Sequence, residues 1–141
     1  MIMKATVKWL DNRIFVGQTG SGHAVVMDGP PEAGGQNLGP RPMEMLLLGM
    51  GGCASFDVVS ILEKMHQPVQ GCVAELTAER AESEPKTFTK INLHFKISGA
   101  VEEGKAARAV KLSAEKYCSA SIMLGKMAEI THSFEVISGD F

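Results

Sequence analysis

An uncharged segment from Met45 to Phe56 most constrains what this chain can fold into. The segment continues a helical pattern that begins at Pro42, where the missing N–H of proline costs nothing, and stops at Pro68. Because it carries no charge on any side, it has no solvent face and must be buried on several sides. A bilayer span needs about 20 apolar residues, which is more than this segment offers. We therefore predict a buried core helix from Pro42 to about Gln67, and no membrane anchor.

Three glycines lie within this predicted helix: Gly49, Gly51 and Gly52. Each costs about 1 kcal/mol relative to alanine inside a helix, so we expect them to permit a close backbone approach. The chain has 141 residues, a length typical of one domain with one core, which predicts a single domain over residues 1–141. One domain of this size has difficulty covering such a helix on all sides. A second copy of the chain would provide the missing cover.

Strand patterns flank the helix on both sides. The clearest is Lys90 to Ile97, in which apolar and polar residues alternate with the period of a half-buried strand. Strands are expected at about 3–9, 14–16, 23–27, 71–80, 90–97 and 131–137, and further helices at about 102–117 and up to 126. The predicted order βββ-α-ββ-α-α-β is that of an α+β domain. Residues 28–42 hold four prolines and four glycines, which indicates a long loop. Its length favours a functional role or contact with a partner, and the alternative is a flexible connection without such a role.

Composition excludes several classes of protein. Lys and Arg total 14 against 16 Asp and Glu, which gives a net charge of −2, and the pI is about 6.1. A chain of this charge has no basic face for nucleic acid or for an anionic membrane. Three cysteines do not make a fully paired disulfide scaffold and favour a reducing compartment. Since the N-terminal residues also lack the apolar core of a signal peptide, we expect a cytoplasmic protein.

Few motifs for chemistry remain. No phosphate-binding glycine loop, metal-ligand spacing or nucleophile elbow is present in the sequence, so neither a metal nor a cofactor is expected. Cys72 falls on the apolar face of a predicted strand and fits a packing role. Cys53 lies in the middle of the predicted helix and, taken alone, reads as a small core residue. Cys118 falls between two predicted helices near Lys116, where a thiol can be either reactive or inert.

Two segments resemble the OsmC/Ohr family. Pro42 to Cys53 (PMEMLLLGMGGC) resembles the start of that family's central helix, in which a cysteine follows a proline and an acidic residue by about three turns. Ser113 to Ser121 (SAEKYCSAS) resembles the family's second cysteine segment. The continuation from Cys53 to Leu62 (CASFDVVSIL) is most similar to the YhfA-like branch of OsmC proteins.

The resemblance implies a fold and a chemistry. The implied fold is an intertwined homodimer whose central helices pack on antiparallel sheets, with two sites at the subunit interface. The implied chemistry is the reduction of organic hydroperoxides. Cys53 would be the attacking thiol and Cys118 the resolving thiol. A dithiol such as dihydrolipoamide would then reduce the resulting disulfide.

The sequence departs from the family at the residues that activate the first thiol. The family's glutamate, ten positions before the first cysteine, is Met43 here, and Glu44 is one residue away. At about 100° per residue, Glu44 lies about 180° around a continuous helix from Cys53. Arg13 is the candidate for the family's activating arginine. Asp57 follows Cys53 by one helical turn, where its negative charge opposes formation of a thiolate.

Three functions therefore stay open. The first is a hydroperoxide reductase that uses Cys53 and Cys118, with Arg13 and Glu44 as possible supporting residues. The second is a non-peroxidase dimer that binds a small apolar ligand or senses redox state. The third is a structural dimer with inert cysteines.

Overall fold

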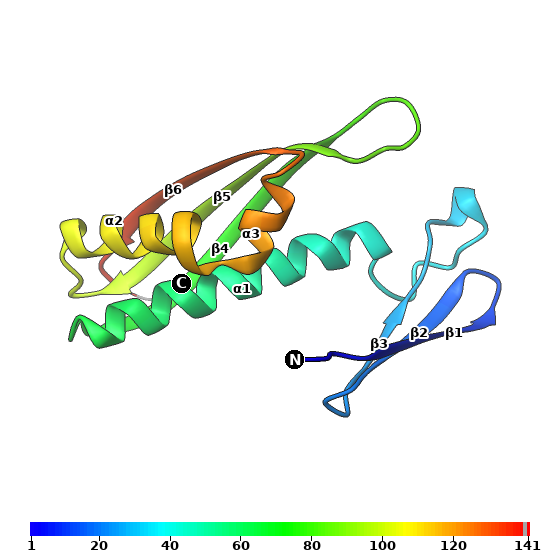
Figure 1. Ribbon diagram of the computed structural model, residues 1–141, viewed down its shortest axis with the longest axis horizontal. Coiled ribbons are helices and arrows are strands. Elements are labelled where there is room, and N and C mark those ends of the chain that lie inside the picture. The colour runs from blue at the N-terminus through cyan, green and yellow to red at the C-terminus, as the bar shows by residue number, and fades with distance from the viewer. Residues whose placement is uncertain (140) are drawn as a thin grey trace. The chain divides into compact units, whose positions relative to one another are not determined.

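The computed structural model describes residues 1–139 and 141 (Figure 1). The chain divides into two compact units, Met1–Leu47 and Leu48–Phe141. The elements follow in the order predicted from the sequence: β1 (Ala5–Asp11), β2 (Ile14–Thr19), β3 (Ala24–Met27), η1 (Pro31–Ala33), α1 (Pro42–Lys64), β4 (Val69–Arg80), β5 (Phe88–Gly99), α2 (Glu103–Leu112), η2 (Ser113–Tyr117), α3 (Ser119–Leu124) and β6 (Glu129–Ile137). The predicted α+β order of elements is confirmed. The single domain over 1–141 stays a prediction.

The first unit contains an antiparallel meander, β1-β2-β3. Trp9 pairs with Phe15, and Phe15 with Met27, so these apolar side chains share one face of the sheet. The alternation in the first strand predicts a buried face, but every residue of β1 is exposed. Trp9, for example, is 61% exposed. The prediction is wrong for the single chain, because no other part of the first unit covers this face of the sheet.

The segment after β3 is held by the carboxylate of Asp28. It accepts hydrogen bonds from the backbone N–H groups of Gly29 at 2.7 Å and of Gln36 and Leu38 at 3.1 Å each. A side chain at Gly35 would overlap the Gly29 carbonyl, so the loop can close in this way only with glycine there. The long loop is thus a built structure rather than a loose connection.

The second unit contains the sheet β4-β5-β6. Strands β4 and β5 pair antiparallel, whereas β5 and β6 pair parallel. The expectation of antiparallel sheets is therefore wrong for this edge. The reason is the long connection through α2, η2 and α3, which carries the chain back before β6 begins and so makes a parallel pairing possible (Figure 1).

The core of the second unit lies between the sheet and its helices. The alternating apolar residues of β5 face this core, as the sequence predicts. The residues of β5, α1 and α2 with at most 1% exposure are Ile91, Leu93, Phe95, Ile97, Met50, Ala54, Val58, Leu62, Ala106 and Ala109. The four from α1 follow at intervals of four, so they form one stripe along the helix.

The fully buried residues of helix α1 are those of the stripe and Gly51. Leu48 is 63% exposed and Phe56 75% exposed, so the prediction of burial on several sides is wrong for a single chain. Of the three glycines, Gly51 lies against the Leu76 side chain, while Gly49 and Gly52 face open space. Helix α1 is long and apolar enough to cross a membrane, but the core helix of a soluble protein can have the same length and composition. In the single chain, 28% of its most apolar stretch is buried. The chain alone leaves most of this apolar surface uncovered.

Candidate functional site: a thiol pair beside a carboxylate

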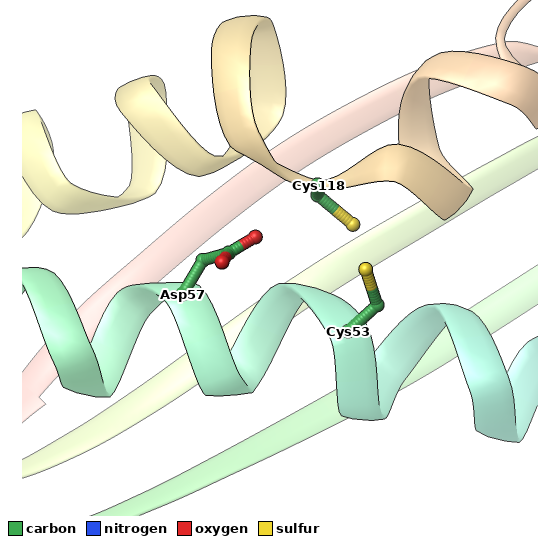
Figure 2. Close-up of side chains that lie close together, drawn as sticks. All are labelled: Cys53, Asp57 and Cys118. Atoms are coloured by element: carbon green, nitrogen blue, oxygen red, sulfur yellow. The ribbon is translucent and has the colours of Figure 1, made fainter. Parts of the chain in front are cut away.

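Three side chains that can bind metals or carry redox chemistry meet inside the second unit (Figure 2). The sulfurs of Cys53 and Cys118 and a carboxylate oxygen of Asp57 all lie within 4.8 Å of one another. Cys53 and Asp57 are four residues apart on α1, and therefore share one face of the helix. Cys118 comes from the segment between η2 and α3, 65 residues later in the sequence. All three cysteines are free thiols.

The backbone holds Cys118 from both sides. Its N–H donates to the carbonyl of Ser113 at 2.8 Å, which closes the π-helical turn Ser113–Tyr117. Its sulfur accepts a hydrogen bond from the N–H of Ser121 at 3.4 Å, so Cys118 is the N-cap of α3. Single π turns are rare in proteins and frequently lie at functional sites. Here the turn ends one residue before the thiol.

Ser113 links the two elements that carry the cysteines. Its hydroxyl donates to the carbonyl of Ala54 at 3.3 Å, a buried contact next to Cys53. Its own carbonyl accepts the N–H of Cys118. The residue is 1% exposed. One serine therefore connects the residue that follows Cys53 with the backbone of Cys118.

Burial dominates the electrostatics of the site. Cys118 is 0% exposed, and burial raises the pKa of its thiol. Contacts with Ser121 lower that pKa, and the Cys53 thiol raises it again. Burial also raises the pKa of Asp57, whose Oδ2 atom is buried without a hydrogen-bond partner among the residues that the structure describes. Burial thus favours the neutral form of the Cys118 thiol, and it leaves one carboxylate oxygen of Asp57 without a compensating hydrogen bond among the described residues.

Cys72 lies apart from the pair, on β4, and is half-buried. Burial raises the pKa of its thiol, and a contact with Ser55 lowers it. A half-buried thiol that is hard to ionise fits the packing role expected from the sequence.

The two predicted supporting residues belong to the first unit. The Arg13 guanidinium donates to the carbonyl of Asn12 at 2.8 Å, and its side chain lies close to Gly29 and Gly34. The Glu44 carboxylate accepts the N–H of Arg41 at 2.8 Å, which caps the start of α1. Glu44 therefore stabilises the N-terminal end of α1. The supporting roles of Arg13 and Glu44 at the thiol site stay predictions.

A surface cavity of about 420 Å³ adjoins Cys118 through Ser121. Its lining includes Ser121 and His132. Among the residues that the structure describes, Ser121 Oγ and His132 Nε2 are buried and have no hydrogen-bond partner. Burial lowers the pKa of His132. Sequence reasoning missed both residues, because a lone serine and a lone histidine carry no spacing signal.

Comparison with known proteins identifies the family. The OsmC-like protein family matches residues 34–133. Protein YhfA of Escherichia coli (strain K12) is 49% identical over 137 residues, which covers 96% of this chain and 99% of YhfA. A hypothetical protein from Aquifex aeolicus, of known crystal structure, is 31% identical with a TM-score of 0.87, and 99% of each chain is covered.

The fold extends to proteins named for peroxide resistance. The crystal structure of an organic hydroperoxide resistance protein OsmC from Legionella pneumophila matches with a TM-score of 0.74 over 96% of this chain and 97% of its own. At 17% identity this likeness shows the fold alone. The family match and the identity to YhfA over nearly the full length confirm the resemblance found in the sequence. This chain is a member of the OsmC-like family and a relative of YhfA within it.

Proposed function

We propose that this protein reduces organic hydroperoxides with Cys53 and Cys118. The observation that carries the proposal is the thiol pair itself: two free sulfurs from distant parts of the chain, within 4.8 Å of each other and pointing toward one another in Figure 2. The chain belongs to the OsmC-like family and has two cysteines close together, and these two facts support a redox role.

The reaction has two steps. The Cys53 thiolate attacks the outer oxygen of the hydroperoxide, the O–O bond breaks, and the leaving alkoxide takes a proton to become an alcohol. Cys53 is then a sulfenic acid. Next, the Cys118 sulfur attacks the Cys53 sulfur, which forms the disulfide and releases water. An external dithiol restores the two thiols and becomes a disulfide itself.

The burial of the two thiols fits this assignment. Cys53 is half-buried and so is the more exposed thiol of the pair, whereas Cys118 is fully buried with a raised pKa, which disfavours its direct oxidation. A disulfide needs an S–S distance of about 2.05 Å. The two sulfurs must therefore approach by no more than about 2.8 Å, since they start within 4.8 Å of each other.

The same proposal includes a homodimer. Members of the OsmC/Ohr family are generally homodimers. Leu48 and Phe56 on α1 and Trp9 on β1 are more than half exposed in the single chain. Large apolar side chains gathered on the central helix and on an open sheet favour contact with a second copy. We also propose a cytoplasmic location, in which a dithiol such as dihydrolipoamide supplies electrons.

The carboxylate at the site supports a second candidate function. Cysteines are activated by neighbouring basic or cationic groups, whereas the side chain beside both thiols here, Asp57, is an acid. The YhfA relative is not named as a peroxidase. A protein with such a pair can act as a slow, reversible redox sensor, or bind a small apolar ligand, instead of turning over peroxide rapidly.

Steady-state turnover separates the two candidates. The reduced protein is mixed with cumene hydroperoxide and dihydrolipoamide, and loss of peroxide is followed. The first candidate predicts sustained turnover that Cys53→Ser abolishes and that the matched variant Cys72→Ser leaves unchanged. Formation of one disulfide per chain without sustained turnover would refute the peroxidase and support the sensor. Turnover that survives Cys53→Ser would refute the assignment of the attacking thiol.

A further inference from the structure

The arrangement of Cys53, Asp57 and Cys118 also has the composition of a metal site. Two sulfurs and one carboxylate oxygen converge from two elements, each within 4.8 Å of the others. Zinc takes thiolate and carboxylate ligands in tetrahedral geometry, at about 2.3 Å from sulfur and 2.0–2.2 Å from oxygen. These bond lengths place the sulfurs about 3.8 Å apart and each sulfur about 3.5 Å from the oxygen. The two sulfurs therefore need to approach by at most about 1.0 Å, and each sulfur and the oxygen by at most about 1.3 Å, since all three atoms start within 4.8 Å of one another.

Cys53 and Asp57 have the spacing of two metal ligands on one helix. Cys53 and Asp57 are spaced at i and i+4, so both reach toward the same side of the helix, as paired ligands on other metal-binding helices do. Cys118 approaches from the facing segment, and the N–H of Ser121 already donates to its sulfur at 3.4 Å. Such outer hydrogen bonds orient a ligand and stabilise its thiolate form.

A buried, unsatisfied atom on one of the three side chains is an independent observation. Asp57 Oδ2 is buried and has no hydrogen-bond partner among the described residues. Neither of the ion pairs found in the described part of the chain involves Asp57. A buried carboxylate oxygen without a donor is costly, and a cation beside it removes that cost.

We propose that Cys53, Asp57 and Cys118 form a binding site for one thiophilic divalent cation, of which Zn²⁺ and Cd²⁺ are the representatives. Soft thiolate ligands select these ions over Mg²⁺ and Ca²⁺. On binding, each thiol releases its proton to solvent, and the two thiolates and the carboxylate bind the ion. Three protein ligands leave a fourth position open for water, as in catalytic zinc sites.

The proposal does not depend on the peroxidase activity, but the two compete for the same sulfurs. A bound cation blocks access to Cys53, and a Cys53–Cys118 disulfide removes both sulfur ligands. The metal-bound form would therefore be protected against hydroperoxide, and the oxidised form would not bind the metal.

The test is a titration of the reduced full-length protein with Zn²⁺ against a chromophoric chelator, and with Co²⁺ to observe thiolate-to-metal charge transfer and tetrahedral d–d bands. One Zn²⁺ per chain is expected, with binding lost in Cys53→Ser and Cys118→Ser and weakened at least about 10-fold in Asp57→Asn. Cys72→Ser is the matched control and should bind as the unaltered protein does. Circular dichroism and urea unfolding establish that each variant is folded.

Several results would overturn the proposal. These are no Zn²⁺ bound to the reduced protein, binding that Asp57→Asn leaves unchanged, or binding lost equally in Cys72→Ser. Equal affinity for Mg²⁺ would also contradict a thiolate site. Failure of peroxide turnover together with normal Zn²⁺ binding would refute the proposed function alone, and normal turnover without Zn²⁺ binding would refute this inference alone.

Discussion

Replacing Ser113 by alanine tests how the two thiols are held together. The Ser113 hydroxyl donates to the Ala54 carbonyl at 3.3 Å in a buried setting, and the Ser113 carbonyl holds the N–H of Cys118. Ser113→Ala removes the first contact and keeps the second. A neutral buried hydrogen bond contributes about 0.5–1.5 kcal/mol, so the free energy of unfolding of the reduced protein should fall by about 1 kcal/mol.

The same contact also sets how easily the disulfide forms. If it positions Cys118 over Cys53, up to about 1 kcal/mol of that positioning is lost, which is about a 5-fold lower equilibrium constant for the disulfide. The assay is a redox titration against glutathione, with the Cys53–Cys118 disulfide quantified by mass spectrometry, alongside urea unfolding. Ser98→Ala is the matched control, since Ser98 is a buried serine of β5 outside the thiol site. If Ser113→Ala lowers the free energy of unfolding but leaves the disulfide equilibrium the same, the Ser113–Ala54 contact does not position Cys118 over Cys53.

Three further predictions concern the loop, the core and the interface. Asp28 has a lowered pKa, because three backbone N–H groups and Arg41 outweigh the effect of burial, so it stabilises the fold when ionised. That stability is fully present above the ordinary pKa of 3.8 and is lost as pH falls through the lower pKa of the folded protein. In acid titrations, Asp28→Asn should weaken the dependence of the free energy of unfolding on pH. An unchanged dependence would contradict the stabilising role of the Asp28 carboxylate. Leu62→Ala, at a side chain with 0% exposure, should cost about 2–5 kcal/mol in urea unfolding, and a loss below 1 kcal/mol would contradict its place in the core. Phe56→Glu places a charge on a side chain that is 75% exposed in the single chain. In sedimentation this variant should convert the proposed dimer into a 15.1 kDa monomer, and a dimer unaffected by the charge would place the interface elsewhere.

Much of the fold follows from local pattern. The alternation in β5 and the extent of α1 between Pro42 and Pro68 depend on neighbouring residues, and both are readable in the sequence. The parallel pairing of β6 with β5 cannot be read from the sequence in this way, because it depends on where the chain returns after the helices that follow β5. The exposure of β1 and of Phe56 is not local either, since what covers an apolar face is decided outside the segment that carries it.

The site divides in the same way. The resemblance assigns Cys53 and Cys118 to one site, and the structure brings their sulfurs together. Asp57 is noticed in the sequence only as a charge one turn from Cys53. Cys118, which completes the cluster, comes 65 residues after Cys53, and no spacing rule joins the two segments. The link through Ser113 leaves no sequence signal at all, since a serine that donates to a distant carbonyl looks like any other serine.

The most direct test of the proposed function is to oxidise the reduced protein with one equivalent of cumene hydroperoxide per chain and to map the cysteine-containing peptides. If the protein is a two-cysteine peroxidase, we expect the loss of two thiols per chain, one disulfide between Cys53 and Cys118, and a Cys72 that stays free. In Cys118→Ser, we expect a Cys53 sulfenic acid that dimedone traps. Survival of both thiols in a large excess of peroxide, or a disulfide that includes Cys72, would contradict the proposed function.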